Sequence, residues 1–192
     1  MAKVERRTKE TQIAVRLNVD GVGEFSCNLG IPFFEHMMNL LTKHALFDIA
    51  LTGKGDLEID AHHTVEDAGI VLGQALKQAL GDKAGIERYG EASVPMEETL
   101  ATCVLDICNR PFLRFDADVA KAKVGTFDTE LAEEFFRAFA FNAGITMHLK
   151  VFYGSNLHHI LEAMFKSVGR ALRQASSRNA RVRGVLSTKG AL

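Results

Sequence analysis

The chain has 192 residues, of which 47% are hydrophobic, and its formal net charge at pH 7 is −1. These values allow one domain or two small fused halves with a real hydrophobic core, and they argue against a nucleic-acid-binding protein. The three cysteines form no C-x-x-C motif, which argues against a thiolate zinc site, and their odd number argues against a disulfide framework. The charged N-terminus lacks an apolar signal segment and no apolar run reaches membrane-spanning length, so we expect a cytoplasmic protein.

The chain begins with strand patterns. Apolar and polar residues alternate over 11–19, Gly21-Val22-Gly23 favours a turn, and 24–28 is expected to pair with the first strand as a β-hairpin. The polar residues 7–11 are expected to be a disordered lead-in to this hairpin.

A helix is expected over 35–47, because Pro32 favours a helix start, and a strand over 48–52 follows it. His36 and His44 lie eight residues apart on this helix, which is about 80° around its axis, so both can face one cavity. Either could be an ordinary core or surface histidine. Because of the histidine motif described next, we interpret His36 as a metal ligand, whereas His44 is either such a histidine or a hydrogen-bonding contact for a substrate.

A histidine-rich motif, His62-His63-Thr64-Val65-Glu66, recurs as His158-His159-Ile160-Leu161-Glu162 at a shift of 96 residues, half the chain. Both copies continue into apolar residues at helical spacing, so each is expected to begin a helix. On a helix, Glu66 can share a metal with His62 or with His63 but not with both, because adjacent imidazoles point apart. Two copies therefore predict two metals. Each motif offers one His–Glu pair, which by itself supplies too few ligands for a metal. The alternative is that these are solvated histidines at the starts of two amphipathic helices. That alternative would require the same His-His-x-x-Glu spacing to arise twice without a metal.

The second half repeats the order of the first, with strands expected over 92–96, 99–107, 112–115 and 145–153 and a helix over 129–143. At a shift of 98 residues His36 falls on Glu134, which predicts a carboxylate ligand at the equivalent place. His148 is expected to have a structural role. We therefore predict an α+β fold of two duplicated halves, 1–92 and 93–192, each with helices on one face of its sheet.

Basic and hydroxyl residues provide candidate phosphate contacts. Arg88 and Arg110 stand at loop positions where a guanidinium can hold a phosphate, or else they form surface ion pairs of little energy. The basic C-terminal segment is either solvated, or binds nucleic acid, or folds over an anionic substrate through Ser187, Thr188 and Lys189.

Taken together, these patterns resemble the imidazoleglycerol-phosphate dehydratase family of histidine biosynthesis, over nearly the whole chain. Besides the two motifs, the segments that carry the resemblance are Arg7-Thr8-Lys9-Glu10-Thr11, Phe34-Glu35-His36-Met37, Asp60-Ala61-His62-His63-Thr64-Val65-Glu66-Asp67, Asn109-Arg110-Pro111, Gly154-Ser155-Asn156-Leu157-His158-His159 and Ser187-Thr188-Lys189-Gly190. The resemblance implies a ribosomal protein S5 domain 2-like fold and a large homo-oligomer, a 24-mer, with active sites between subunits. Active sites between subunits are consistent with motifs that each supply too few ligands for a metal.

The resemblance also implies the reaction: dehydration of D-erythro-imidazole glycerol phosphate to imidazole acetol phosphate and water, with two Mn²⁺ ions per active site. If both ring nitrogens of the substrate bind metal, the ring is stabilised as imidazolate and can expel the hydroxyl to give a diazafulvene-like intermediate. A carboxylate then removes the acidic proton of the side chain. Glu10 is the expected base, with Glu66 and Glu162 as rivals.

The site residues follow by position. The expected metal ligands are His36, His62, His63, Glu66, His158, His159 and Glu162, to which the shift adds Glu134. The expected substrate contacts are Glu10, His36, His44, His62, Glu66, Arg88, Arg110, His158, Lys166, Ser187, Thr188 and Lys189.

Other functions stay open for the same residues. In a metal hydrolase, water would fill the open coordination positions. In a metal-clipped structural oligomer or metal store, the clusters would serve assembly only. A nucleic-acid-binding role depends on the basic tail alone and requires salt-dependent binding.

Overall fold

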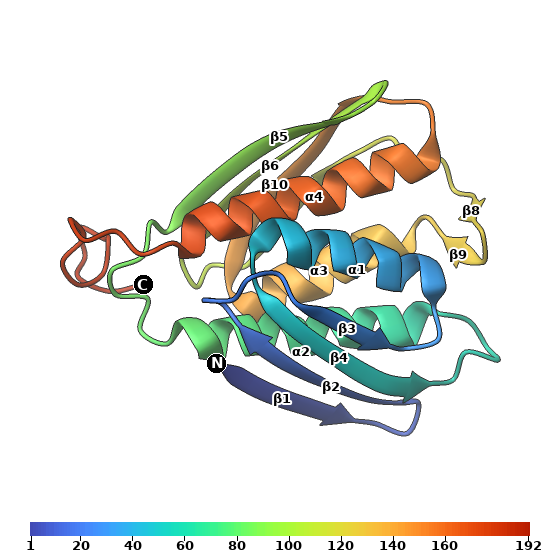
Figure 1. Ribbon diagram of the computed structural model, residues 1–192, viewed down its shortest axis with the longest axis horizontal. Coiled ribbons are helices and arrows are strands. Elements are labelled where there is room, and N and C mark those ends of the chain that lie inside the picture. The colour runs from blue at the N-terminus through green and yellow to red at the C-terminus, as the bar shows by residue number, and fades with distance from the viewer.

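The computed structural model describes residues 1–192 as two four-stranded sheets with four helices between them (Figure 1). The first half contains β1 (Ala2–Arg7), β2 (Thr11–Asn18), β3 (Phe25–Asn28), α1 (Pro32–Ala45), β4 (Asp48–Gly55) and α2 (His62–Leu80). The second half contains β5 (Tyr89–Met96), β6 (Thr99–Ile107), β7 (Phe112–Asp116), β8 (Lys123–Val124), β9 (Phe127–Asp128), α3 (Leu131–Ala143), β10 (Ile145–Tyr153) and α4 (Leu157–Ser176).

The two sheets have the same topology. Their strand orders are β1-β2-β4-β3 and β5-β6-β10-β7, and in each sheet the last strand listed runs parallel to its neighbour. The predicted duplicated α+β fold is therefore confirmed, and the β8–β9 hairpin is an insertion in the second half. The division at residue 92 stays a prediction, since β5 runs across it.

The helices join the two halves into one core. Helix α2 packs on β1 and β2, and α4 packs on β5 and β6, so each sheet has helices on one face (Figure 1). Between these layers α1 packs against α4 and α3 packs against α2, which pairs a helix of one half with a helix of the other. A single cluster of 45 buried residues fills the space, so neither half has a core of its own.

Two glycines allow the helix pairs to approach closely. A Cβ at Gly169 of α4 would lie 2.5 Å from the carbonyl oxygen of Leu41 in α1, and a Cβ at Gly73 of α2 would lie 2.6 Å from that of Phe139 in α3. Gly73 and Gly169 are related by the same 96-residue shift as the histidine motifs. The duplication therefore extends to the packing of the helices.

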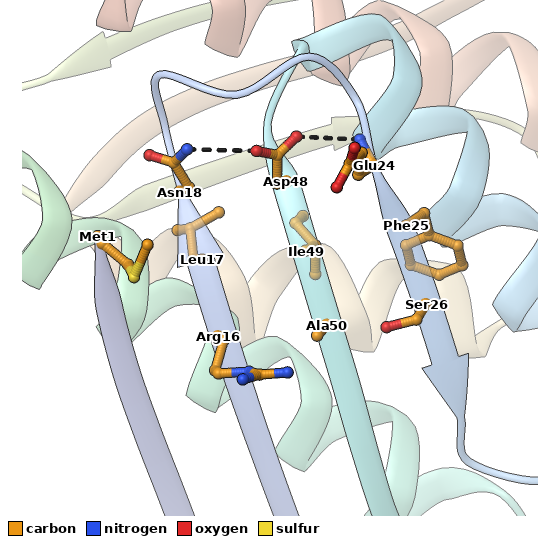
Figure 2. A pocket seen from close by; sticks show the side chains of 10 residues that line it. All are labelled: Met1, Arg16, Leu17, Asn18, Glu24, Phe25, Ser26, Asp48, Ile49 and Ala50. Atoms are coloured by element: carbon orange, nitrogen blue, oxygen red, sulfur yellow. Dashed lines mark hydrogen bonds between the residues drawn. The ribbon is translucent and has the colours of Figure 1, made fainter.

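The predicted hairpin of 11–19 with 24–28 is wrong. Strand β2 pairs with β1 and β4, whereas β3 pairs with β4 in parallel. Parallel neighbours need a long crossover, and α1 supplies it. The glycine-rich stretch is a loop that Asp48 holds in place: its Oδ1 accepts the N–H groups of Val22 and Glu24, and Asn18 donates to its Oδ2. Figure 2 shows Asp48 between Asn18 and Glu24, beside a cavity of about 360 Å³.

The predicted disordered lead-in is also wrong. Residues 7–11 form the tight connection between β1 and β2, and β1 is a full edge strand. Its inward side carries the buried Ala2 and also Arg6, whose Nε donates to Asp67 of α2 at 2.7 Å. The sequence did not predict this strand, because a charged residue, Arg6, occupies an inward position where a strand pattern has an apolar one.

The four helices begin at the same end of the molecule. In Figure 1 the N-termini of α1 to α4 all lie at the right, together with the β1–β2 and β5–β6 turns. Residues 177–192 and the start of β5 lie at the left. None of the helices is long and apolar enough to cross a membrane.

Candidate functional site

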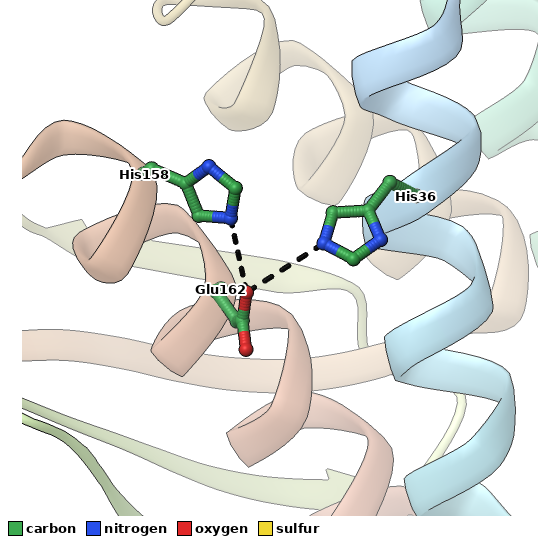
Figure 3. A group of neighbouring side chains, drawn as sticks. All are labelled: His36, His158 and Glu162. Carbon is green, nitrogen blue, oxygen red and sulfur yellow. Dashed lines mark hydrogen bonds and ion pairs between the residues drawn. The ribbon is translucent and has the colours of Figure 1, made fainter.

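One cluster of predicted ligands forms where α1 meets α4. Oε2 of Glu162 lies 3.1 Å from Nε2 of His158 and 3.6 Å from Nε2 of His36 (Figure 3). One ligand atom from each residue lies within 4.8 Å of the other two. Two imidazoles and a carboxylate are a donor set that suits a divalent transition metal. The cluster takes one residue from the first half and two from the second.

Lys166 keeps the carboxylate of this cluster charged. Its Nζ donates to Oε1 of Glu162 at 2.5 Å, one helical turn along α4. Burial by itself raises the pKa of Glu162, but the hydrogen bond and charge of Lys166, together with His158, lower that pKa below its usual value. Glu162 is therefore an anion that faces the two histidines.

A second group surrounds His63 at the start of α2. Nδ1 of His63 lies 3.0 Å from Oδ2 of Asp56, and Oε2 of Glu10 lies 3.9 Å from the same nitrogen. The hydrogen bond to Asp56 raises the pKa of His63. Glu10 and Asp56 line a wholly polar cavity of about 320 Å³ between the β1–β2 turn and the end of β4.

A third group surrounds His159 at the start of α4. Nδ1 of His159 lies 2.7 Å from Oε2 of Glu98, which stands in the β5–β6 turn. Oε1 of Glu98 accepts the backbone N–H groups of Asn156 and Ser155. The bond to His159 and those backbone bonds lower the pKa of Glu98, and Glu98 in turn raises the pKa of His159. Glu97 has an oxygen within 4.8 Å of this pair but makes no hydrogen bond to the ring.

Three other expected ligands are not brought together within one chain. The ring centroid of His62 lies 6.0 Å from that of His63, at right angles to it, so the two imidazoles diverge as expected for neighbours on a helix. Glu66 makes no side-chain hydrogen bond or ion pair, and Glu134 lies 3.8 Å from Arg137 on its own helix. The first motif therefore forms no cluster like that of His36, His158 and Glu162.

Two further histidines lie away from these groups. His44 is half-buried in the last turn of α1, where burial, followed by the charges of Lys166 and Arg170, lowers its pKa. His148 is exposed on the outer face of the second sheet, with its ring 5.7 Å from that of Phe112.

The predicted phosphate contacts line a basic cavity of about 720 Å³ at the other end of the molecule. Its walls include Arg88, Arg110, Ser187, Thr188 and Lys189. Arg88 is itself buried, because its Nε and Nη2 bind Asp106 at 2.6 and 2.9 Å and its Nη1 donates to the carbonyl of Leu186 at 2.7 Å. These contacts hold the C-terminal segment as one wall of the cavity. Arg110 is exposed, and its Nη2 lies 3.5 Å from Oδ2 of Asp106.

Two residues that hydrogen-bond to these histidines were not predicted from the sequence. Asp56 stands seven residues before His63, and Glu98 is 61 residues from His159. A polar residue beside a histidine motif is a weak local signal for Asp56. No local signal points to Glu98, because only the folding of β5 and β6 over α4 brings it to His159.

Comparison with known sequences identifies the family. A profile of the imidazoleglycerol-phosphate dehydratase family matches residues 29–172. The chain is 58% identical over 191 residues to the imidazoleglycerol-phosphate dehydratase of Pelobacter propionicus, covering 100% of this chain and 98% of the relative. It is also 58% identical over 190 residues to that of Acetivibrio thermocellus, covering 99% and 97%.

Solved structures agree. The imidazoleglycerol-phosphate dehydratase of Staphylococcus aureus matches with a TM-score of 0.82 and 41% identity, covering 93% of this chain and 100% of that one. The enzyme from Pyrococcus furiosus matches with a TM-score of 0.85 and 35% identity, covering 98% and 100%. The chain therefore belongs to the imidazoleglycerol-phosphate dehydratase family.

Proposed function

We propose that this chain catalyses the dehydration of imidazole glycerol phosphate to imidazole acetol phosphate in histidine biosynthesis, as a metal-dependent hydro-lyase. Family membership over the full length supports the reaction class. The observation that carries the site assignment is the cluster of His36, His158 and Glu162, which joins both halves of the duplication at one end of the molecule.

The metal we propose is Mn²⁺, with two ions per active site. The donor set fits, since an ionised Glu162 faces two imidazole nitrogens that make no other side-chain hydrogen bond. His36, His158 and Glu162 would hold one ion. The remaining candidates for the second ion are His62, His63, Glu66, Glu134 and His159. When bound, manganese would stabilise negative charge on the imidazole ring of the substrate and so favour loss of the hydroxyl group.

The chain's own residues supply proton transfer and binding. Glu10 is our candidate base for the proton on the carbon next to the leaving hydroxyl, because its side chain is 57% exposed at the polar cavity and is held by no short contact. Arg110, Ser187, Thr188 and Lys189 would bind the phosphate, with Arg88 as the residue that positions the C-terminal wall. Lys166 keeps Glu162 ionised.

A second copy of the chain is required by this proposal. The histidine motifs stand at the starts of α2 and α4, whereas the C-terminal segment lines the basic cavity. Figure 1 shows the helix N-termini and the C-terminal segment at opposite ends, so one small substrate reaches both only where two chains meet. The outer face of the second sheet supports self-association, since Val104, Phe112 and Phe152 are 43%, 49% and 52% exposed on it. We propose a large homo-oligomer, a 24-mer, with active sites between subunits.

The test is turnover of imidazole glycerol phosphate by the metal-stripped protein with and without added Mn²⁺. We expect product only with Mn²⁺. We also expect Glu10→Gln to bind Mn²⁺ as the wild type does while turnover falls at least about 100-fold, because the base is lost but no proposed ligand is changed. Full activity of Glu10→Gln would remove this residue from the role. Hydrolysis of simple phosphoesters without dehydration would favour a metal hydrolase instead.

A further inference from the structure

The second histidine of each motif is held in the same way by a different carboxylate. Nδ1 of His63 lies 3.0 Å from Asp56, and Nδ1 of His159 lies 2.7 Å from Glu98. In each pair the carboxylate engages Nδ1, so Nε2, on the far side of the ring, is left free. The two carboxylates come from different elements, the end of β4 and the β5–β6 turn.

The duplication shows that these two carboxylates are not equivalent. Thr11 begins β2 and Thr99 begins β6, and both are buried at matching places in sheets of the same strand order. The residues just before them, Glu10 and Glu98, therefore correspond. Glu98 holds its histidine at 2.7 Å, whereas Glu10 lies 3.9 Å from the nitrogen of His63.

Asp56, which contacts His63 in place of Glu10, also has a counterpart in the second half. Gly55 ends β4 and pairs with Thr11, the first residue of β2, whereas Gly154 directly follows β10 and a Cβ on it would lie 2.5 Å from Oγ1 of Thr99, the first residue of β6. The residues that follow them, Asp56 and Ser155, therefore correspond. At these two corresponding positions the first half has Glu10 and Asp56, and the second half has Glu98 and Ser155.

The side chain of Asp56 makes no other hydrogen bond that would give it a structural role. Its Oδ2 contacts His63, and its Oδ1 is buried without a hydrogen-bond partner. A buried carboxylate oxygen without a partner costs stability, so its presence points to a role at the histidine.

We propose that Asp56 and Glu98 are positioning residues that keep the ring proton of His63 and His159 on Nδ1 and present Nε2 to a divalent metal, and that Asp56 thereby leaves Glu10 free to act as the base. This inference rests on the proposed function. Carboxylates in this place orient metal-binding histidines and raise their affinity as ligands. The two halves thus differ in chemistry because Asp56 has taken over the contact that Glu98 makes in the other half.

The effect of Glu98→Gln follows from its hydrogen bonds. Oε1 of Glu98 accepts N–H groups from Asn156 and Ser155 at 2.8 and 3.2 Å, so the oxygen of a glutamine stays on that side. Its NH₂ group then faces Nδ1 of His159, which must accept, and the ring proton moves to Nε2. A protonated Nε2 cannot bind a metal, so we expect the Kd for Mn²⁺ to rise about tenfold or more.

The experiment measures the Kd for Mn²⁺ of the full-length protein by electron paramagnetic resonance, for the wild type and for Glu98→Gln, Asp56→Asn, Glu97→Gln and Glu10→Gln. Glu97→Gln is the matched control, because it removes one negative charge at the neighbouring residue, which makes no hydrogen bond to His159. We expect weaker binding in Glu98→Gln and Asp56→Asn only. ¹⁵N NMR of the metal-free proteins should show the ring proton moved from Nδ1 to Nε2 at the affected histidine, a change that a general loss of stability does not produce.

The outcomes separate the two proposals. Wild-type affinity and an unchanged ring tautomer in both Glu98→Gln and Asp56→Asn would overturn the positioning roles, even if the wild type is an active dehydratase. Weaker Mn²⁺ binding in Glu10→Gln with normal binding in Asp56→Asn would assign His63 to Glu10 and overturn the proposed division of roles. A wild type that binds no Mn²⁺ would instead overturn the metal-dependent function. If Glu98→Gln does not fold, Asp56→Ala, which removes the acceptor of the His63 ring proton, decides the positioning role, because the side chain of Asp56 makes no hydrogen bond to the backbone.

Discussion

At the scale of single residues, two carboxylates of this chain hold backbone segments in place. Glu98 accepts two backbone N–H groups, and Asp48 does the same for the loop before β3. Backbone N–H groups favour the charged form of a carboxylate. Both residues therefore have lowered pKa values, and both fix segments that the sequence alone leaves undefined.

Asp48 gives a pH-dependent prediction. Backbone N–H groups of Glu24 and then Val22 lower its pKa, so the folded state binds this proton less tightly than the unfolded state does. The resulting stability is present above the unfolded pKa of about 4 and is lost as pH falls through the lower folded value. We expect Asp48→Asn to have a lower Tm than the wild type at pH 7, with a difference that shrinks as pH falls below about 4. A Tm difference that stays constant from pH 7 to pH 2.5 would contradict this role.

At the scale of elements, periodicity predicted the helices well and strand pairing poorly. Helix α2 begins at His62 and α4 at Leu157, as the duplicated motif predicts, because helical spacing and capping residues are local. The parallel pairing of β3 with β4 depends on where α1 packs, and no short segment records that.

The candidate site shows the same limit. Repetition in the sequence was enough to single out the histidines of the two motifs and Glu162. The partners of those histidines were not predictable, since Glu98 reaches His159 only through the fold. The cluster of His36 with His158 likewise depends on α1 packing against a helix of the other half.

The glycine contact between α1 and α4 gives a prediction at this scale. In Gly169→Ala, the new methyl would lie 2.5 Å from the carbonyl of Leu41, so the helices must separate. Overpacking of this kind costs about 1–3 kcal/mol, which the better helix propensity of alanine offsets by up to about 1 kcal/mol. We expect a net loss of about 1–2 kcal/mol in the free energy of unfolding, measured with urea. The exposed Lys77→Ala on α2 is the control, and equal stability of the two variants would show that α1 and α4 adjust freely.

At the scale of the whole molecule, the two candidate functional regions are separated by the length of the helices. The β1–β2 turn, which lines the polar cavity, lies where the helices begin, and the C-terminal segment, which lines the basic cavity, lies beyond the end of α4. Figure 1 shows these two segments at opposite ends. A substrate with an imidazole ring at one end and a phosphate at the other is too small to reach both regions of one chain. The proposed active site would therefore combine the histidine end of one chain with the basic end of another.

Subunit mixing tests this directly. Glu10→Gln damages one end and Lys189→Ala the other, and neither changes a proposed metal ligand, so both variants should assemble. If each active site combines two chains, an oligomer that contains both variants has some sites built from two intact ends. With random mixing at equal amounts, roughly a quarter of the sites are intact, and co-expression should restore roughly a quarter of wild-type turnover, although each variant alone is nearly inactive. Size-exclusion chromatography would check that the mixed sample matches the wild type in size. No recovery in mixed oligomers of the correct size would mean that both regions act within one chain, and the shared active site would have to be abandoned.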